Sequence, residues 1–333
     1  MNVEEWFQNN RFSYKSYTSV KKLLRLKRES RKKISVIIPV LNEGKTIGKI
    51  CNTIKTRLME KNKLVDELIV IDSGSTDNTL DEAKSNGATV YSADKILKKH
   101  RHYMGKGENL WKGMYVSTGG IIVVIDGDIR NFNTRFITGL VGPLLNNKNL
   151  KYINSYFERP FVKGEVITES GGGRVTELLI RPLFNKFFPR LRGFIQPLGG
   201  AYAVRRSTLE KIPLYTGYSG DVIIPIDIQR IFGLGTMAQV DLGKIVHKHQ
   251  QLSSLSNKSF GILHTILTRV NMKGKIIVLN KSNHYSVIET KKTEHKRQYD
   301  YKKKTFYEKE RPPIITLMEY RKKFKIGEFK QWK

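Results

Sequence analysis

Two aspartates, Asp126 and Asp128, stand one residue apart at the end of the apolar run 121–125. An unbroken apolar run that stops at a turn signal predicts a central strand of a parallel sheet, and open α/β sheets bind ligands at the carboxyl ends of such strands. Two carboxylates at that position repel each other unless a cation lies between them. A divalent cation that also holds a diphosphate would meet this need, whereas an ordinary Asp-Gly turn is the alternative.

The first two predicted strands also end in residues that a nucleotide could contact. Pro39, Leu41 and Glu43 close the first strand, and Ser73 lies in the turn 72–75 that closes the second. A base edge and a ribose need a few fixed acceptors and backbone groups, which two loops at one sheet edge would supply. Ordinary turn and capping chemistry is the alternative for each loop taken alone.

A cationic element follows in the segment Gly105-Lys106-Gly107. Its glycines would let the backbone approach a ligand closely, and Lys106 would place one ammonium group there. The segment lacks the spacing of a P-loop, and a flexible surface lysine is the alternative interpretation. Together with the aspartates, it favours a site for a negatively charged ligand.

Three consecutive glycines, ending at Gly173, precede Arg174, Thr176 and an apolar helical segment. Successive backbone N–H groups in such a turn can form an anion-binding nest, and the start of a helix adds its dipole. Arg174 adds a planar fork that fits phosphate or carboxylate, and Thr176 adds a hydroxyl group. The segment predicts a site for a small acceptor that carries both kinds of group, with a flexible hinge as the alternative.

Two histidines, His247 and His249, follow an apolar segment. On a strand their side chains would point to the same face of the sheet, where they could bind a metal ion. A packed or solvent-facing histidine is the commoner case, so these residues alone do not establish a metal site.

The order of the elements supplies a scaffold that brings strand ends together. Strand-like segments at 34–41, 66–72, 88–92 and 121–125 alternate with helical segments. This order predicts right-handed crossovers and an α/β fold around a mostly parallel, Rossmann-like sheet. We expect residues 34–130 to form the nucleotide-binding half and residues 131–255 the acceptor-binding half of one domain, with basic helical extensions at 1–33 and 256–333.

Composition limits the class of protein. The formal net charge is +30, of which residues 1–33 contribute +7 and residues 271–333 contribute +11. Such basic ends could touch an anionic membrane surface or nucleic acid, but no recognised nucleic-acid-binding motif accompanies them. Cys51 is the single cysteine, and the chain shows neither a signal peptide nor an apolar stretch of membrane-spanning length. We expect a cytoplasmic protein that does not bind nucleic acid.

Taken in order, these motifs resemble the glucosyl-3-phosphoglycerate synthases. The resemblance covers roughly residues 34–255 and rests on ISVIIPVLNE, DELIVIDSGSTDNT, GKGENLW, VVIDGD, GGGRVTELLIRPL, QPLGGAYAVRR and QVDLG…VHKH. The early strand motifs are shared by many glycosyltransferases of the GT-A fold, whereas GGGRVTELL and QPLGGAYA are more specific. The resemblance implies a metal-dependent hexosyltransferase that retains anomeric configuration and moves glucose from a nucleotide donor, with UDP-glucose favoured, to the 2-hydroxyl of 3-phosphoglycerate.

The resemblance also implies a role for each candidate residue. The donor nucleotide would contact Pro39, Leu41, Glu43, Ser73, Lys106 and Asp126. Asp128 and His247 would be ligands of Mg²⁺ or Mn²⁺, and the acceptor's acid and phosphate groups would contact Gly173, Arg174 and Thr176. Catalysis would depend on Lys106, Asp126, Asp128 and Asp221. Relatives further suggest a homodimer.

Two positions depart from the family pattern, and two other functions compete. Asp221 stands where a glutamate often contacts the donor sugar, and His249 stands where an asparagine often assists the acceptor, so the identities of the hexose and the acceptor are the open questions. One competing function is a GT-A transferase that acts on a polyprenyl or lipid phosphate at a membrane surface. The other is a basic nucleic-acid-binding protein that has kept an inactive transferase fold.

Overall fold

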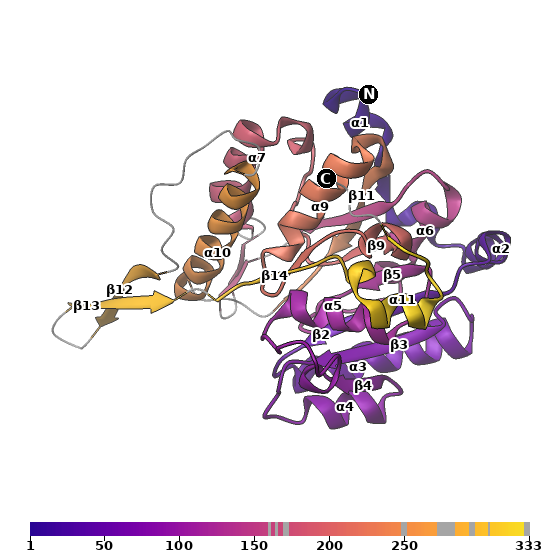
Figure 1. The fold of residues 1–333 in the computed structure, drawn as a ribbon, viewed down its shortest axis with the longest axis horizontal. Coiled ribbons are helices and arrows are strands. Elements are labelled where there is room, and N and C mark those ends of the chain that lie inside the picture. Colours follow the sequence, from indigo (N-terminus) through magenta and orange to yellow (C-terminus); the bar gives the residue numbers. More distant parts are fainter. Residues whose placement is uncertain are drawn as a thin grey trace.

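An eight-stranded sheet forms the centre of the molecule (Figure 1). The computed structural model describes residues 1–158, 161–163, 166–168, 173–247, 252–271, 284–292, 297–305 and 307–329. In spatial order the strands are β1 (Arg11–Ser13), β11 (Met237–Lys244), β6 (Tyr152–Glu158), β9 (Tyr202–Arg205), β5 (Ile121–Val124), β2 (Ile34–Val40), β3 (Glu67–Asp72) and β4 (Thr89–Ser92). Only β9 runs antiparallel to its two neighbours within this sheet. The predicted mostly parallel α/β fold is therefore confirmed.

Helices cover both faces of this sheet and bury two separate apolar clusters. Because strand side chains alternate between faces, Val36 and Ile38 of β2 enter one cluster while Ile37 enters the other. The first cluster takes side chains from α2 (Val20–Ser30), α3 (Gly44–Ile54), α4 (Thr79–Ser85) and α6 (Arg135–Asn146). The second takes them from α1 (Val3–Asn9), α5 (Lys106–Val116), α7 (Arg181–Phe187), α8 (Arg206–Leu209), α9 (Gly220–Phe232), α10 (Leu252–Asn271) and α11 (Met318–Phe324).

Short elements connect these layers. The single-turn helical segments are Tyr14–Tyr17, Lys55–Glu60, Ala93–Lys95, Thr176–Ile180, Pro189–Leu191, Leu234–Thr236 and Ile314–Thr316. The remaining strands form three small antiparallel pairs, namely β7 (Phe161–Lys163) with β8 (Val166–Thr168), β10 (Leu214–Tyr215) with β14 (Glu310–Arg311), and β12 (His284–Lys292) with β13 (Arg297–Thr305). The pairing of β10 with β14 brings the C-terminal part of the chain back to α5, which matters for the site described below.

The two ends of the chain differ from the predicted helical extensions. Residues 1–33 do form two helices, but β1 between them pairs in parallel with β11 and becomes the edge strand of the central sheet. Residues beyond 271 form the β12–β13 hairpin, which projects from the body in Figure 1, and the strand β14 before α11. The lysine-rich composition concealed these strands, since alternating tyrosine, valine and isoleucine carry the strand signal there.

Among the described residues, no helix is both long and apolar enough to cross a membrane.

Candidate active site

Asp126, Asp128 and His247 lie along the edge of the sheet formed by the carboxyl ends of its parallel strands. Each offers a ligand atom within 4.8 Å of the others. Asp126 and Asp128 follow β5, while His247 follows β11, three strands away. Backbone hydrogen bonding joins the two loops, because the N–H of Arg130 donates to the carbonyl oxygen of Val246 at 2.9 Å. The sheet edge thus collects residues that are 119 positions apart in the sequence.

Within this cluster, His247 and Asp128 contact each other directly. His247 Nδ1 lies 3.0 Å from Asp128 Oδ1. Burial alone would raise the pKa of Asp128, but the hydrogen bond and charge of His247 together with Lys106 hold that pKa below its usual value. Asp128 is therefore a carboxylate at neutral pH.

A divalent cation fits the residues of this cluster. His247 Nε2 is buried and has no hydrogen-bond partner among the described residues, which leaves one imidazole nitrogen to be satisfied. Two carboxylates and an imidazole are common ligands of Mn²⁺ and related divalent ions. His247 does not lie on a strand as the sequence suggested, because β11 ends at Lys244, and His249 lies outside the described residues.

Lys106 lies beside the cluster of Asp126, Asp128 and His247, and all three of its N–H donors are engaged. Its Nζ is 2.7 Å from Asp126 Oδ1, 2.9 Å from Asp221 Oδ2 and 2.7 Å from the carbonyl oxygen of Gly200. An ammonium group has three donors, so these contacts use its full capacity. Lys106 thereby connects the sheet edge, through Asp126, to the first turn of α9, through Asp221.

The pKa values of this group follow from its burial and its charges. Burial would lower the pKa of Lys106, but Asp126 and Asp221 hold it well above its ordinary value. Burial also raises the pKa of Asp221, and the charge of Lys106 only partly offsets that effect. Lys106 is therefore a permanent cation at neutral pH, and Asp221 is the carboxylate that most depends on it.

Gly105 and Gly107 serve a different purpose from the one predicted. We expected them to let a ligand approach the backbone, but a Cβ on Gly107 would lie 1.7 Å from the carbonyl oxygen of Tyr215, and one on Gly105 would lie 2.6 Å from that of Thr216. The backbone of the turn before α9 occupies this space. The N–H groups of Gly107 and Glu108 donate to the carbonyls of Gly217 and Thr216. The glycines therefore lock the start of α5 against that turn.

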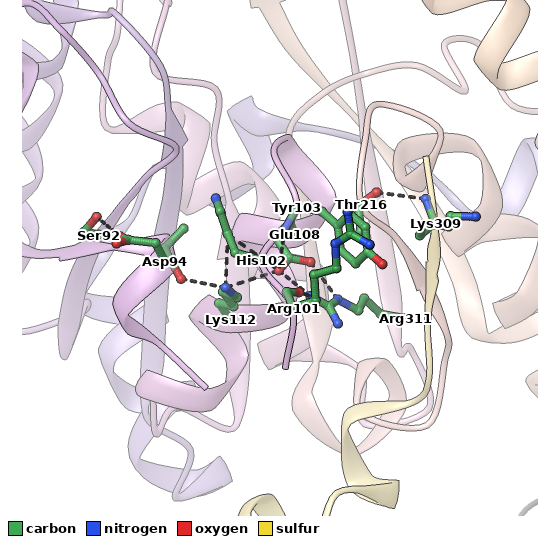
Figure 2. A network of polar contacts seen from close by, with 11 residues as sticks. Ser92, Asp94, Arg101, His102, Tyr103, Glu108, Lys112, Thr216, Lys309 and Arg311 are labelled. Carbon is green, nitrogen blue, oxygen red and sulfur yellow. Dashed lines mark hydrogen bonds and ion pairs between the residues drawn. The ribbon is translucent and has the colours of Figure 1, made fainter. Parts of the chain in front are cut away.

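A buried charge network further along the helix also holds α5 (Figure 2). Arg311 donates to both carboxylate oxygens of Glu108, at 2.8 and 2.6 Å, and its guanidinium lies 4.6 Å from the Trp111 ring centroid. Lys112 lies 3.2 Å from Glu108 Oε1, and both of these side chains are fully buried. Burial is the largest influence on Lys112 and lowers its pKa. The C-terminal strand β14 thus fixes the helix whose first residue is Lys106.

The predicted nucleotide loops after β2 and β3 lie together at the same edge. Pro39 pairs with Ile71 in the parallel ladder, and the N–H of Ser73 donates to the carbonyl of Val40 at 3.1 Å. Leu41 is 43% exposed, which is unusual for a leucine at the end of a buried strand. This edge therefore presents Pro39, Leu41 and Ser73 from adjacent loops.

Glu43 joins these loops to the metal-binding cluster. It immediately precedes α3, and its N–H donates to Thr79 Oγ1 at 2.8 Å. In the first turn of the same helix, Thr46 Oγ1 donates to the carbonyl of Gly127, between the two aspartates, at 2.6 Å. The loops that we assign to the nucleotide are therefore hydrogen-bonded to the turn that carries Asp126 and Asp128.

The predicted acceptor residues start the segment that leads into α7. Gly173 has a φ of +84°, a Cβ there would have no neighbour within 4 Å among the described residues, and its carbonyl accepts from the N–H of Glu177. Arg174 is half-buried, and Thr176 is buried at 2% exposure. The preceding glycines, 171 and 172, lie outside the described residues. The positive φ at Gly173 fits the predicted glycine turn, while its role as an anion site stays a prediction.

Sequence reasoning missed two residues near this cluster, Tyr218 and Lys258. Tyr218 lies in the turn that precedes Asp221, and Lys258 on α10 places its Nζ 3.7 Å from the Tyr218 ring centroid. Neither belongs to a recognisable motif, and Lys258 is 152 residues away from Lys106 in the sequence. Tertiary packing alone brings them to the site.

Comparison with known proteins places these features in a family. Residues 35–173 match the family model described as glycosyl transferase family 2. A glucosyl-3-phosphoglycerate synthase from Petrotoga mobilis is 43% identical over 313 residues, which are 94% of this chain and 95% of that protein.

Solved structures give the same result. The crystal structure of mannosyl-3-phosphoglycerate synthase from Rubrobacter xylanophilus aligns with a TM-score of 0.84 at 33% identity, covering 94% of this chain and 97% of that one. Glucosyl-3-phosphoglycerate synthase from Mycobacterium tuberculosis, solved with Mn²⁺, UDP-glucose and phosphoglyceric acid, aligns with a TM-score of 0.74 at 33% identity, covering 89% and 94%. The fold and the order of the site motifs are therefore those of these transferases.

Proposed function

Since the chain belongs to the glucosyl-3-phosphoglycerate synthase family, a group of hexosyltransferases, we propose that it transfers glucose from UDP-glucose to the 2-hydroxyl of 3-phosphoglycerate with retention of configuration. The observation that carries this proposal is the contact of Lys106 with both Asp126 and Asp221. That contact joins a metal-binding sheet edge to a carboxylate suited to a sugar hydroxyl. UDP-glucose and phosphoglyceric acid are bound together in the Mycobacterium tuberculosis relative.

Asp126, Asp128 and His247 would hold the divalent cation, either Mg²⁺ or Mn²⁺. When bound, such an ion supplies Lewis-acid neutralisation of the donor's diphosphate. The chain itself contributes the orientation of the ligands. The hydrogen bond between His247 and Asp128 fixes the ring and leaves Nε2 for a further partner.

Lys106 orients the two carboxylates in the proposed mechanism. It holds Asp221 at 2.9 Å and Asp126 at 2.7 Å, so it sets the distance between the sugar side and the diphosphate side of the site. Asp221 then accepts hydrogen bonds from hydroxyl groups of the donor sugar. Preorganised side chains of this kind lower the barrier because they need no rearrangement during the reaction.

Retention of configuration follows from the use of Asp221 as an orienting group. An inverting transferase needs a carboxylate base on the acceptor side, and Asp221 is the residue that could take this role. Its Oδ2 lies 2.9 Å from Lys106 Nζ, so that oxygen is engaged in an ion pair instead of being left for an acceptor proton. We assign the acceptor's proton instead to the departing phosphate oxygen, in a front-face transfer.

On the acceptor side, Arg174 would bind the phosphate or the carboxylate of 3-phosphoglycerate, and Gly173 and Thr176 would add a backbone and a hydroxyl contact. Arg174 directly follows the positive-φ turn at Gly173 and is half-buried. An arginine fork matches both kinds of anionic group. His249 and the homodimer stay predictions.

Product analysis tests this proposal. The protein is incubated with UDP-glucose, Mn²⁺ and 3-phosphoglycerate, and the product is examined by NMR for its linkage position and anomeric coupling. We expect an α-glucoside on the 2-hydroxyl. A β-glucoside would overturn retention, and a product that forms only with GDP-mannose would overturn the assignment of glucose.

A further inference from the structure

The reaction creates a charge that the residues assigned so far do not fully meet. In the proposed transfer, the bond from the glucosyl carbon to the β-phosphate oxygen breaks and its electron pair stays on that oxygen. The glucosyl carbon forms a bond to the acceptor oxygen, whose proton moves to the departing phosphate. Negative charge therefore builds up on the diphosphate before the proton arrives, and a positioned cation would stabilise that state.

Lys106 is poorly placed to be that cation on its own. Its three donors already contact Asp126, Asp221 and the carbonyl of Gly200, at 2.7 to 2.9 Å. A phosphate oxygen could reach it only if one of these contacts broke. Breaking the ion pair with Asp221, whose side chain is 12% exposed, would leave a largely buried carboxylate without that partner, which is costly. Stabilisation of the departing diphosphate would therefore need a second ammonium or guanidinium group near it.

Lys258 on α10 meets this requirement. Its Nζ lies 3.7 Å from the centroid of the Tyr218 ring, three residues before Asp221. The charged groups that influence its pKa are Asp126, Asp128, Lys106 and Asp221, which are the same groups that form the site. Burial lowers its pKa, and the aspartates act in the opposite direction. Lys258 is therefore directed to the site by an aromatic face and by three carboxylates.

The helix that carries Lys258 is itself anchored. Arg269, further along α10, lies 3.0 Å from Asp227 Oδ2 of α9 and also pairs with Glu310 of β14. Asp227 is fully buried, and Arg269 nearly so. These contacts fix α10 against α9, whose first turn holds Asp221, so Lys258 has a defined position relative to the sugar side of the site.

We propose that Lys258 binds phosphoryl oxygens of the donor diphosphate and stabilises the charge that develops on it as the glucosyl bond breaks. This assignment rests on the proposed function, because it names a further residue for the same reaction. The Tyr218 ring orients the ammonium group. The acceptor's phosphate offers the same chemistry and is the competing ligand.

The test compares Lys258→Met with the native protein by titration with UDP and with UMP in the presence of Mn²⁺. UMP lacks the β-phosphate, so its affinity should not change. We expect UDP affinity to fall about tenfold or more, as for loss of a hydrogen bond to a charged group. Transfer should slow by roughly 10- to 100-fold in kcat, below the loss for a fully buried donor because Lys258 is half-buried.

Two further variants keep this test decisive. Lys258→Arg retains the cation and should recover most of the UDP affinity. Lys84→Met removes an exposed lysine from α4, on the opposite face of the sheet, and should leave both affinities unchanged. Unchanged UDP binding and unchanged kcat in a folded Lys258→Met protein would overturn the proposal. A raised KM for 3-phosphoglycerate with normal UDP affinity would overturn the donor assignment and place Lys258 at the acceptor.

Failure of the proposed function would give a different result. Binding of UDP and UMP requires neither an acceptor nor turnover. A native protein that binds UDP with Mn²⁺ but transfers nothing to 3-phosphoglycerate would contradict the proposed acceptor, while the titrations would still decide the role of Lys258.

Discussion

At the sheet edge, Asp126 and Asp128 are placed by a four-residue strand and the turn that follows it, whereas Lys106 and Asp221 reach the site from the first turns of two helices. The edge residues meet His247 through the ladder β5–β9–β6–β11, in which β9 is antiparallel, and through hydrogen bonds between the two loops, such as that from Arg130 N–H to the carbonyl of Val246. The helix-borne residues depend on buried ion pairs, among them Arg311 with Glu108 and Arg269 with Asp227. The strands therefore position the candidate metal ligands, and the C-terminal strand β14 positions the helices that carry the other charges.

The electrostatic consequences also differ between the two regions. The pKa of Asp128 at the edge is lowered, since its neighbours outweigh its burial. The pKa values of Asp221 and Asp227 on α9 are raised, since burial outweighs the effect of their cationic neighbours. Removing a cation should therefore lower the stability of the helical region more than that of the edge. Removing a carboxylate should lower activity most when the carboxylate lies at the edge.

The largest effect is expected at the edge. Asp128→Asn keeps the shape of the side chain but removes the charge that a divalent ion needs. We expect activity with Mn²⁺ to fall by about 10³-fold or more, since a bound metal contributes several kcal/mol to the transition state. Thermal unfolding without metal should change little. A variant that kept a tenth of native activity would contradict the assignment of Asp128 as a ligand.

Lys106→Met tests whether the two regions depend on one cation. The change leaves Asp221 and Asp126 without their shared partner, so we expect a loss of about 3 kcal/mol in the free energy of unfolding and a loss of activity of roughly 10²-fold. Adding Asp221→Asn to the same protein should restore part of the stability but none of the activity. Equal stability of the single and double variants, measured by denaturant unfolding, would argue against the ion pair.

Arg311→Met tests the helical region alone. It removes one partner of the buried Glu108 while Lys112 still contacts that carboxylate, so we expect a loss of about 3 kcal/mol of stability, at the low end of the range for breaking buried pairs. The matched control is Lys322→Met on the exposed side of α11, which should cost about 0.5 kcal/mol or less. Similar unfolding midpoints for the two variants would show that β14 does not hold α5.

Arg174→Ala separates binding of the acceptor from the chemistry at the edge. We expect the KM for 3-phosphoglycerate to rise by roughly 10- to 100-fold, as for loss of a charge-assisted hydrogen bond, with UDP affinity unchanged. Steady-state kinetics at varied acceptor concentration measures this. Normal turnover at low acceptor concentration would exclude Arg174 from the acceptor site.

The smallest effect is expected from Asp221→Glu. The extra methylene moves the carboxylate toward the sugar, so we expect the preference between UDP-glucose and other hexose donors to shift by only about tenfold, as for a single methylene in a substrate pocket. Comparison of kcat/KM for UDP-glucose and GDP-mannose measures the shift. An unchanged ratio would remove Asp221 from the determinants of hexose specificity.

The sequence was sufficient for the edge because its signals are local. Apolar runs identified β2, β3 and β5, and Asp126 with Asp128 interrupts the last of these at its carboxyl end. The histidine pair after an apolar segment indicated His247, although its spacing suggested a strand, and the resemblance to known transferases implied its role as a ligand. The position of each of these strands follows from its apolar run, which is visible in the sequence.

The helical region could not be predicted in the same way. Lys258 is the single lysine of α10 and Arg311 stands in a lysine-rich stretch, neither belongs to a motif, and their partners lie tens to hundreds of residues away. Gly105 and Gly107 were correctly singled out, but their space is filled by the 215–217 backbone, which no local pattern reveals. Long-range ion pairs and backbone contacts of this kind depend on the completed fold.

The most direct measurement is nucleotide release from UDP-glucose with Mn²⁺, with and without 3-phosphoglycerate, and with GDP-mannose in parallel. We predict release that requires the metal, UDP-glucose and 3-phosphoglycerate together. Release that proceeds equally well without 3-phosphoglycerate, or no release with either donor, would contradict the proposed reaction.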